Sequence, residues 1–174
     1  LDLRRKAGGN NHPDVALSLN SLGLVLRSEG KPAEAERLHR EALAMQKQLL
    51  GNEHLAVATS LNNLALALRD EGRLEEAEKC FRESLAMQKK LLGDNHPAVA
   101  ITTDNLAFVL RDEGKLDEAE ALVRQSLALQ QKLFGEEHPS VATALNNLAL
   151  VLAAREQFGG SVSLHCTALA MRRW

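Results

Sequence analysis

Apolar residues recur at intervals of three and four along most of the chain. Between residues 55 and 72 this spacing places one stripe on one face of a helix: Val57, Leu61, Leu64, Ala65 and Leu68. A second amphipathic segment follows from about 74 to 92, with its inner stripe at Leu74, Ala77, Phe81, Leu85 and Gln88 to Leu92. No segment alternates apolar and polar residues as a strand does. The pattern therefore predicts an all-α chain of antiparallel helix pairs, each pair joined by about two residues.

Short sequence signals mark where these helices end and begin. Gly72 follows the first helix, at the place where a left-handed residue is usually glycine, and Gly30 and Gly114 occupy the same place in their copies. The second helices end at three further glycines: Gly51, Gly93 and Gly135. The next helix opens with His-Pro at 12–13, 96–97 and 138–139, and proline suits the first helical position.

These signals repeat at a fixed interval of 42 residues, which is clearest in four histidines: His12, His54, His96 and His138. A period of this size is typical of one helix pair copied in tandem, each copy burying its apolar face against its neighbours. We interpret residues 1–174 as a single repeat array, with the end of a preceding repeat at 1–11 and repeats at 12–53, 54–95, 96–137 and 138–174.

The fourth repeat is degenerate and incomplete. Glu156 replaces the stop glycine, and Gly159-Gly160 weakens the second helix by roughly 1 kcal/mol for each glycine. The segments LDLRRK at the start and LAMRRW at the end both match the interior of a second helix. We therefore expect the chain to be a segment of a longer protein.

Composition narrows the classes of partner. Apolar residues make up 45% of the 174 residues and aromatic residues only 3%, so the packing depends on Leu, Ala and Val. The net charge of −2 argues against binding to nucleic acid or to a membrane surface. No apolar run approaches the roughly 20 residues that span a bilayer. Cys80 and Cys166 lie two repeats apart and out of phase, so we expect reduced thiols and a cytoplasmic protein.

The order of large and small residues across one helix pair resembles the tetratricopeptide repeat. In the second repeat that order runs Leu61, Leu64, Ala65, Leu68, Gly72, Leu74, Ala77, Phe81 and Ser84, and Leu22-Gly23 matches the Leu-Gly pair of the motif. A 42-residue unit with LNNLA in its first helix and GxxHPxVA before it is similar to the kinesin-light-chain class. The resemblance implies an α-solenoid, a right-handed superhelix of tandem helix pairs. The chain lacks a heptad coiled coil, so attachment to kinesin is not implied.

The resemblance also implies a ligand-binding groove along the first helices, which in this family holds an extended peptide or a partner helix. Two rows of polar residues would face it. The first row is Asn20, Asn62, Asp104 and Asn146, and the second is Ser21, Asn63, Asn105 and Asn147. An Asn side chain both donates and accepts, so it can pair with the main chain of an extended ligand. The alternative is that these residues only tie neighbouring helices together.

Two further rows accompany the polar ones. Arg27, Arg69 and Arg111 stand two helical turns beyond the first row, and guanidinium groups there would favour acidic side chains or a C-terminal carboxylate. The alternative is that the carboxylates of Asp70-Glu71 and Asp112-Glu113 neutralise them. Apolar residues lie between the rows and offer either pockets for a partner or ordinary packing: Leu24, Leu66, Phe108 and Leu150.

The four periodic histidines do not predict a metal site. Equivalent atoms on stacked helix pairs lie on the order of 10 Å apart, whereas zinc ligands must converge at about 2 Å from the metal. We interpret each His-Pro as the start of a helix. His39 and His165 take the place of Phe81 and Val123, and we expect partly buried packing residues there.

The sequence predicts a non-catalytic scaffold for protein–protein interaction, with no cofactor. It contains no nucleophile elbow and no phosphate-binding loop, and we interpret Glu75, Glu76 and Glu78 as a solvated helix face. Two alternatives stay open. Apolar helix faces exposed at cut ends could drive head-to-tail self-association. The resemblance also allows the sensing or regulatory arm of a larger enzyme or signalling protein.

Overall fold

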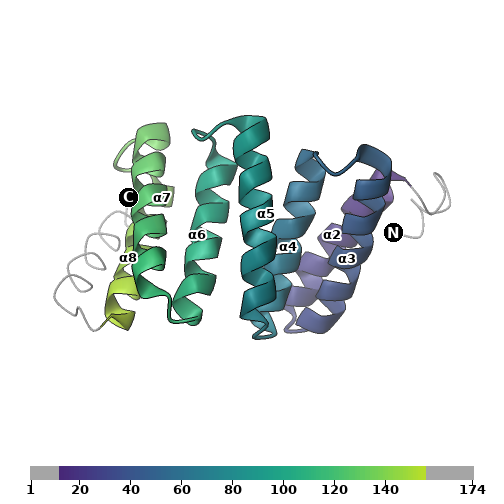
Figure 1. Cartoon of the computed structure of the whole chain (residues 1–174), viewed down its shortest axis with the longest axis horizontal. Helices are drawn as coiled ribbons and strands as arrows, with labels where there is room; N and C mark the ends of the chain where they lie inside the picture. The colour runs from purple at the N-terminus through teal and green to yellow at the C-terminus, as the bar shows by residue number, and fades with distance from the viewer. Residues whose placement is uncertain (1–11, 156–174) are drawn as a thin grey trace. The chain divides into compact units, whose positions relative to one another are not determined.

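The computed structural model describes residues 12–155, and all regular structure in that range is helical (Figure 1). Seven helices follow one another: α2 Pro13–Ser28, α3 Pro32–Leu50, α4 Leu55–Asp70, α5 Leu74–Leu92, α6 Pro97–Asp112, α7 Leu116–Phe134 and α8 Pro139–Ala154. Short turns join them into antiparallel pairs, which confirms the predicted elements. The expected stub at 1–11 and the second helix of the fourth repeat, with Gly159-Gly160, His165 and Cys166, lie outside the described residues.

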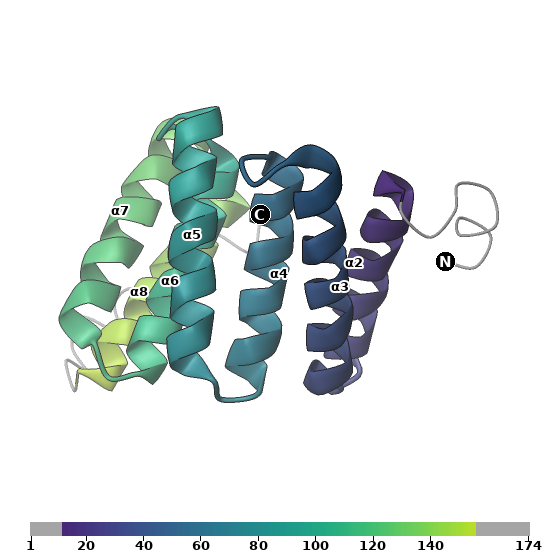
Figure 2. The ribbon, with the colours of Figure 1, turned by 45° about the vertical axis from the view of Figure 1, so that its right-hand side comes forward.

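The helices form two compact units that divide between Leu91 and Leu92. In the first unit α3 packs against both α2 and α4, and in the second unit α7 packs against both α6 and α8 (Figure 2). The first helices also touch one another within each unit, α2 with α4 and α6 with α8. Each first helix is therefore held from two sides, by a second helix and by the other first helix of its unit.

The chain reverses after α2, α4 and α6 through a hydrogen-bonded turn built on glycine. After α4, the N–H of Gly72 donates to the carbonyl of Arg69 at 2.9 Å, and that of Arg73 donates to Leu68 at 2.9 Å. Gly72 has φ +78°, a left-handed conformation that L side chains rarely adopt. The predicted stop is confirmed, and it brings α5 back along α4.

Each first helix begins at a histidine whose ring caps it. The Nδ1 atom accepts a hydrogen bond from the backbone N–H two residues later: Asp14 at 3.2 Å, Ala56 at 3.1 Å, Ala98 at 3.1 Å and Ser140 at 3.1 Å. The bond satisfies one of the N–H groups that a helix leaves unpaired at its start. The structure confirms that His-Pro starts helices, and it adds that the imidazole itself is the cap.

Small side chains and glycine allow close contact inside each pair. Ser84 donates its hydroxyl to the carbonyl of Ala58 at 2.7 Å, which joins α5 to α4 through the core. His39 is fully buried rather than partly buried as the sequence predicted, because Gly23 leaves room for its ring on the facing helix. A Cβ atom at position 23 would stand 2.6 Å from Cε1 of His39, closer than packed atoms approach.

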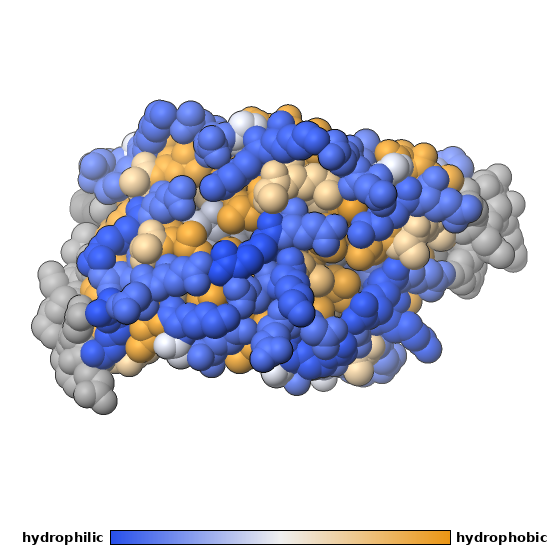
Figure 3. All heavy atoms as spheres, in the orientation of Figure 1, coloured by the Kyte–Doolittle hydropathy of each residue, from blue (hydrophilic) through white to orange (hydrophobic). Residues whose placement is uncertain are grey.

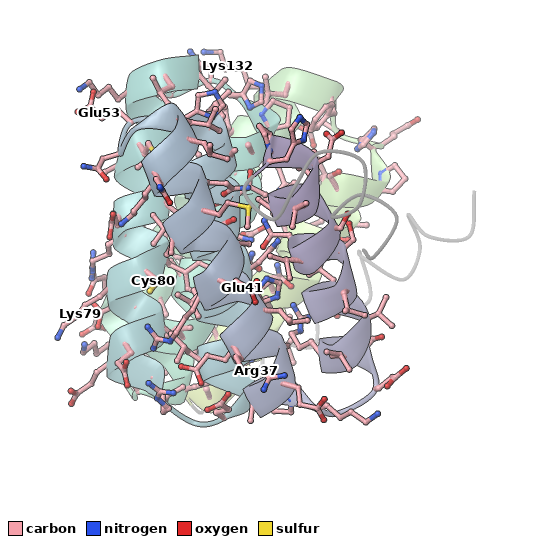
Figure 4. The ribbon with its side chains drawn as sticks, turned by 90° about the vertical axis from the view of Figure 1, so that its right-hand side faces the viewer. Arg37, Glu41, Glu53, Lys79, Cys80 and Lys132 are labelled. Carbon is pink, nitrogen blue, oxygen red and sulfur yellow. The ribbon has the colours of Figure 1, made fainter. Side chains whose placement is uncertain are left out.

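Charged side chains cover the outer faces of the second helices. Figure 3 shows mainly hydrophilic residues on one such face, and Figure 4 shows Arg37 and Glu41 along α3 with Lys79 extending from α5. Arg73 bonds Glu36 at 2.7 Å and Glu76 at 2.8 Å. Glu75 and Glu76 are exposed, in agreement with the interpretation as a solvated face, whereas Glu78 is half-buried and pairs with Arg82 at 2.6 Å. None of the described helices is both long enough and apolar enough to cross a membrane.

We expect Gly23→Ala to destabilise the protein by up to about 2 kcal/mol, although alanine favours a helix. Overpacking a buried contact costs about 1 to 3 kcal/mol, and the gain in helix propensity is about 1 kcal/mol at most. Urea unfolding followed by circular dichroism measures the change. The matched double variant Gly23→Ala/His39→Val copies the pair Ala107 and Val123 of the third repeat. It should lose less stability than the two single variants added together, and strict additivity would contradict a clash.

Candidate functional site

The two predicted polar rows lie on the first helices but differ in exposure along each row. In the first row Asn20 and Asp104 are buried, and Asn62 and Asn146 are half-buried. In the second row Asn63 and Asn147 are buried, Asn105 is half-buried and Ser21 is exposed. Neither row presents the same surface in every repeat. The residues best placed to meet a ligand are therefore Asn62, Asn105 and Asn146.

Asn20 belongs to a buried hydrogen-bond chain in the first unit. Its Oδ1 lies 2.9 Å from Nδ1 of His39, and its Nδ2 donates to Oγ of Ser60 at 2.6 Å. Ser60 in turn donates to Oε1 of Gln46 at 2.6 Å. Burial, aided by the charge of Arg27, lowers the pKa of His39 to about 4 and keeps its imidazole neutral. Asn20 thus joins α2, α3 and α4, which is the structural role weighed as an alternative.

In the second unit an aspartate takes the place of that asparagine. Gln130 donates from Nε2 to Oδ2 of Asp104 at 2.9 Å. Among the described residues no hydrogen bond reaches Oδ1, which is buried. Burial raises the pKa of Asp104 to about 6, and hydrogen bonding from Ser126, Gln130 and Asn147 opposes that rise. The carboxylate is therefore largely ionised at neutral pH, and among the described residues its partners are neutral groups and no cation.

A hollow of about 250 Å³ opens beside Asp104, between α6 and α8. The lining residues are Ile101, Asp104, Asn105, Phe108, Gln130, Ser140, Thr143 and Asn147. Three of the predicted peptide-binding residues, Asn105, Phe108 and Asn147, thus meet at one place. Because apolar side chains and amide groups share this wall, the hollow can hold an apolar stem and hydrogen-bond a polar end.

The arginine row is partly paired with carboxylates. Arg27 Nε lies 3.0 Å from Oδ2 of Asp70, and Arg111 Nη2 lies 2.7 Å from Oδ1 of Asp112. The guanidinium of Arg111 also stands 5.0 Å from the ring centre of Phe108. Arg69 is half-buried. With two of its three members neutralised, the row has less to offer an acidic ligand than its sequence spacing implied.

The apolar row remains accessible between the polar ones. Leu24 is 42% exposed and Leu150 is 38% exposed, while Leu66 and Phe108 are half-buried. Apolar side chains left at this level of exposure on a first helix can take part in contacts with a partner.

Residues 12–155 contain no cluster of three or more His, Cys, Asp or Glu side chains able to hold a metal ion. The periodic histidines already use Nδ1 in helix caps. Cys80 has a free, half-buried thiol, and burial raises its pKa. Burial of this kind makes a thiol less reactive, so Cys80 is a packing residue.

Sequence reasoning missed the buried polar partners of the first row. His39, Ser60 and Gln46 surround Asn20, and Gln130 and Ser126 surround Asp104. One signal was available, because Gln46, Gln88 and Gln130 recur at the 42-residue interval. A glutamine repeated on the inner stripe of a helix indicates a polar partner on the facing helix.

Comparison with known proteins agrees with this architecture. The family model described as Tetratricopeptide repeat matches residues 1–48, 16–90, 56–107 and 99–173. Two crystal structures contain nearly identical TPR-like repeats assigned to a kinesin light chain of Podosopora anserina. Each is 27% identical and covers 98% of this chain and 81% of that one, with TM-scores of 0.82 and 0.78. None of the curated proteins in the comparison matches the chain.

Two more distant structures show the same fold. BtubC (BKLC) from P. vanneervenii is 24% identical, with a TM-score of 0.84 over 98% of this chain and 68% of that one. The Rap protein, complexed with competence and sporulation factor, is 14% identical, with a TM-score of 0.78 over 91% of this chain and 43% of that one. Together these likenesses confirm the predicted all-α solenoid of tandem helix pairs.

We expect Asp104→Asn to change how stability depends on pH. The folded pKa of about 6 lies above the ordinary value of 3.8, so the folded state binds the proton more tightly than the unfolded state. The stability that this group contributes below pH 3.8 is therefore lost as pH rises through 6. Asparagine at position 104 cannot titrate. The free energy of unfolding of Asp104→Asn relative to wild type should rise by about 2 to 3 kcal/mol between pH 4 and pH 7.

Urea unfolding at several pH values measures this difference. Asp117→Asn is the matched control, because it removes the same group from a side chain on α7 that is 91% exposed. A difference curve for Asp104→Asn as flat as that of the control would contradict the burial of a titrating carboxylate.

Proposed function

Because the chain belongs to the tetratricopeptide repeat family, with repeats like those of kinesin light chains, we propose that it is a non-catalytic scaffold that binds an extended peptide segment of a partner protein along its first helices. The observation that carries this proposal is the hollow between α6 and α8, where Asn105, Phe108 and Asn147 line one accessible wall. The hollow combines amide groups with apolar surface, which is the combination that an extended peptide requires.

The spacing of the first helices suits main-chain pairing. Packed helices lie about 8 to 10 Å apart, and an extended chain advances about 3.3 Å for each residue. Asn105 on α6 and Asn146 on α8, which are both half-buried, would therefore meet peptide groups about three residues apart. A carboxamide can donate to a carbonyl and accept from an N–H, so this pairing holds for many ligand sequences. Neighbouring apolar side chains would supply selectivity.

The proposal depends on the amides more than on the arginines. Arg27 and Arg111 are engaged by Asp70 and Asp112, so an acidic ligand would have to displace these pairs before it gained from them. Ligand binding has a precedent at the level of the fold, since the Rap protein structure is a complex with competence and sporulation factor. The chemistry of that complex does not transfer to this chain at 14% identity.

The test begins with a random library of peptides displayed on phage and selected against the wild-type chain. Fluorescence anisotropy then gives the Kd of the selected peptides for wild type and for Asn105→Ala/Asn146→Ala. We expect the double variant to bind at least tenfold more weakly, because each lost amide bond is worth about 1 kcal/mol. Helix content and melting temperature should stay close to the wild-type values.

The matched control is Asn52→Ala, in the exposed loop between α3 and α4. It removes a carboxamide away from the first helices and should leave the Kd unchanged. A library that yields no binder would contradict the proposal. So would an equal loss of affinity in Asn105→Ala/Asn146→Ala and in the control Asn52→Ala. Sedimentation of the free chain over a hundredfold range of concentration tests head-to-tail association, for which the mass should rise.

A further inference from the structure

We propose that the hollow between α6 and α8 receives a positively charged side chain of the partner, a lysine in the first instance, with the Asp104 carboxylate as its counter-ion. This inference rests on the proposed function and adds to it the chemical class of one ligand side chain. It also reverses the preference for acidic ligands that the arginine row had suggested.

Asp104 has unused capacity to accept hydrogen bonds. An ionised carboxylate offers about four lone-pair sites, and Gln130 occupies one of them at 2.9 Å. Ser126 and Asn147 also favour the charged form by hydrogen bonding, so among the described residues three neutral groups support this carboxylate and no cation does. Oδ1 is buried without a partner, and the residue as a whole is only 8% exposed. A desolvated carboxylate without full pairing is costly, so a donor that reaches it gains more than it would at the surface. Because the two oxygens of a carboxylate are equivalent, rotation about the Cβ–Cγ bond lets either one face the hollow.

No cation of the lining competes for this carboxylate. Among residues 12–155, Asp104 is the one charged residue that lines the hollow, and α8 contains no charged residue from Pro139 to Ala154. The remaining charges of α6, Arg111 and Asp112, bond each other. On α7, Lys132 donates to Asn95 at 3.0 Å.

The other cations near α7 are also engaged. Arg124 and Arg155 both bond Glu120, and Arg155 also lies 2.9 Å from Asp117. Among the described residues, these cations are engaged by other carboxylates or amides, so a cation that a partner supplies would meet a carboxylate charge without a counter-ion.

The shape of the hollow suits a charge at the end of an apolar stem. Ile101, 59% exposed, and Phe108 give its apolar surface, and Asp104, Gln130 and Asn147 give its polar surface. The methylenes of lysine can lie along the apolar surface while the ammonium group meets the carboxylate. An acidic side chain would instead meet Asp104 as a like charge. At the equivalent position the other repeats have neutral amides, Asn20, Asn62 and Asn146, so this feature is specific to the third repeat.

The experiment uses the full chain labelled with ¹⁵N and two capped tripeptides, acetyl-Gly-Lys-Gly-amide and acetyl-Gly-norleucine-Gly-amide. Norleucine has the apolar stem without the charge. The side-chain amide signals of Asn105, Gln130 and Asn147 report occupation of the hollow. We expect the lysine peptide to shift these signals in a saturable way and to bind at least tenfold more tightly than the norleucine peptide, since a charged hydrogen bond is worth about 1.5 to 3 kcal/mol.

Asp104→Asn should bring the affinity for the lysine peptide down to that of the norleucine peptide. This variant carries the residue found at the same position in the other three repeats, so it keeps the shape of the site. Asp117→Asn, the same substitution at an exposed site of the same unit, should change nothing. Equal binding of the two peptides, or unchanged binding of lysine by Asp104→Asn, would overturn the inference. A peptide with arginine in place of lysine, if it binds as tightly, supports a site for cations in general.

The two proposals fail separately. If the peptides selected from the library lose affinity in Asn105→Ala/Asn146→Ala while the lysine tripeptide shifts no amide signal, the cation site is overturned and the peptide scaffold stands. If the lysine tripeptide binds through Asp104 while the library yields no binder, the cation site stands and the peptide scaffold does not.

Discussion

The reversal of the chain after α2, α4 and α6 is the constraint on which the rest of the structure depends. Gly72, at φ +78°, closes the turn with two backbone hydrogen bonds and returns the chain along the helix it has just left. Two helices joined so closely must pack over their whole length, which requires small side chains such as Ser84 where they meet. The histidine cap then fixes the start of the next helix. The side chains that line the hollow between α6 and α8 are therefore placed by the fold before any ligand is involved.

A repeated backbone here carries side-chain chemistry that differs from repeat to repeat. At the first polar position, Asn20 completes a buried chain of hydrogen bonds with His39 and Ser60. At the equivalent position, Asp104 keeps one oxygen without a partner and lies against an open hollow. The first arrangement contributes to the cohesion of three helices. The second arrangement lowers the stability of the fold at neutral pH, because the ionised Asp104 carboxylate is buried. Buried groups that lower stability in this way are often found at binding sites.

The helices could be predicted from the sequence because their signals are local. The second helix of the second repeat begins at Leu74 and ends at Leu92, as predicted, since periodicity and glycine fix both ends. The resemblance to a family placed Asn105 and Asn147 on the ligand-facing side, and the structure brings both to the hollow. The burial of Asn20 and Asp104 could not be predicted from the sequence, because it depends on hydrogen-bond partners 19 to 40 residues away along the chain. The full burial of His39 could not be predicted from its own helix. It depends on Gly23 of the facing helix, where the absence of a Cβ atom leaves room for the imidazole ring.

The single carboxylate at position 104 bears on how a long ligand would align. A ladder of identical amides binds an extended chain equally well after a shift by one repeat, so the complex would be a mixture of alignments in exchange. One charged position among neutral equivalents removes that degeneracy, because only one alignment places a cation beside Asp104. The same logic fixes the register of coiled coils through one buried polar residue. A periodic scaffold can thereby hold its partner in a unique alignment.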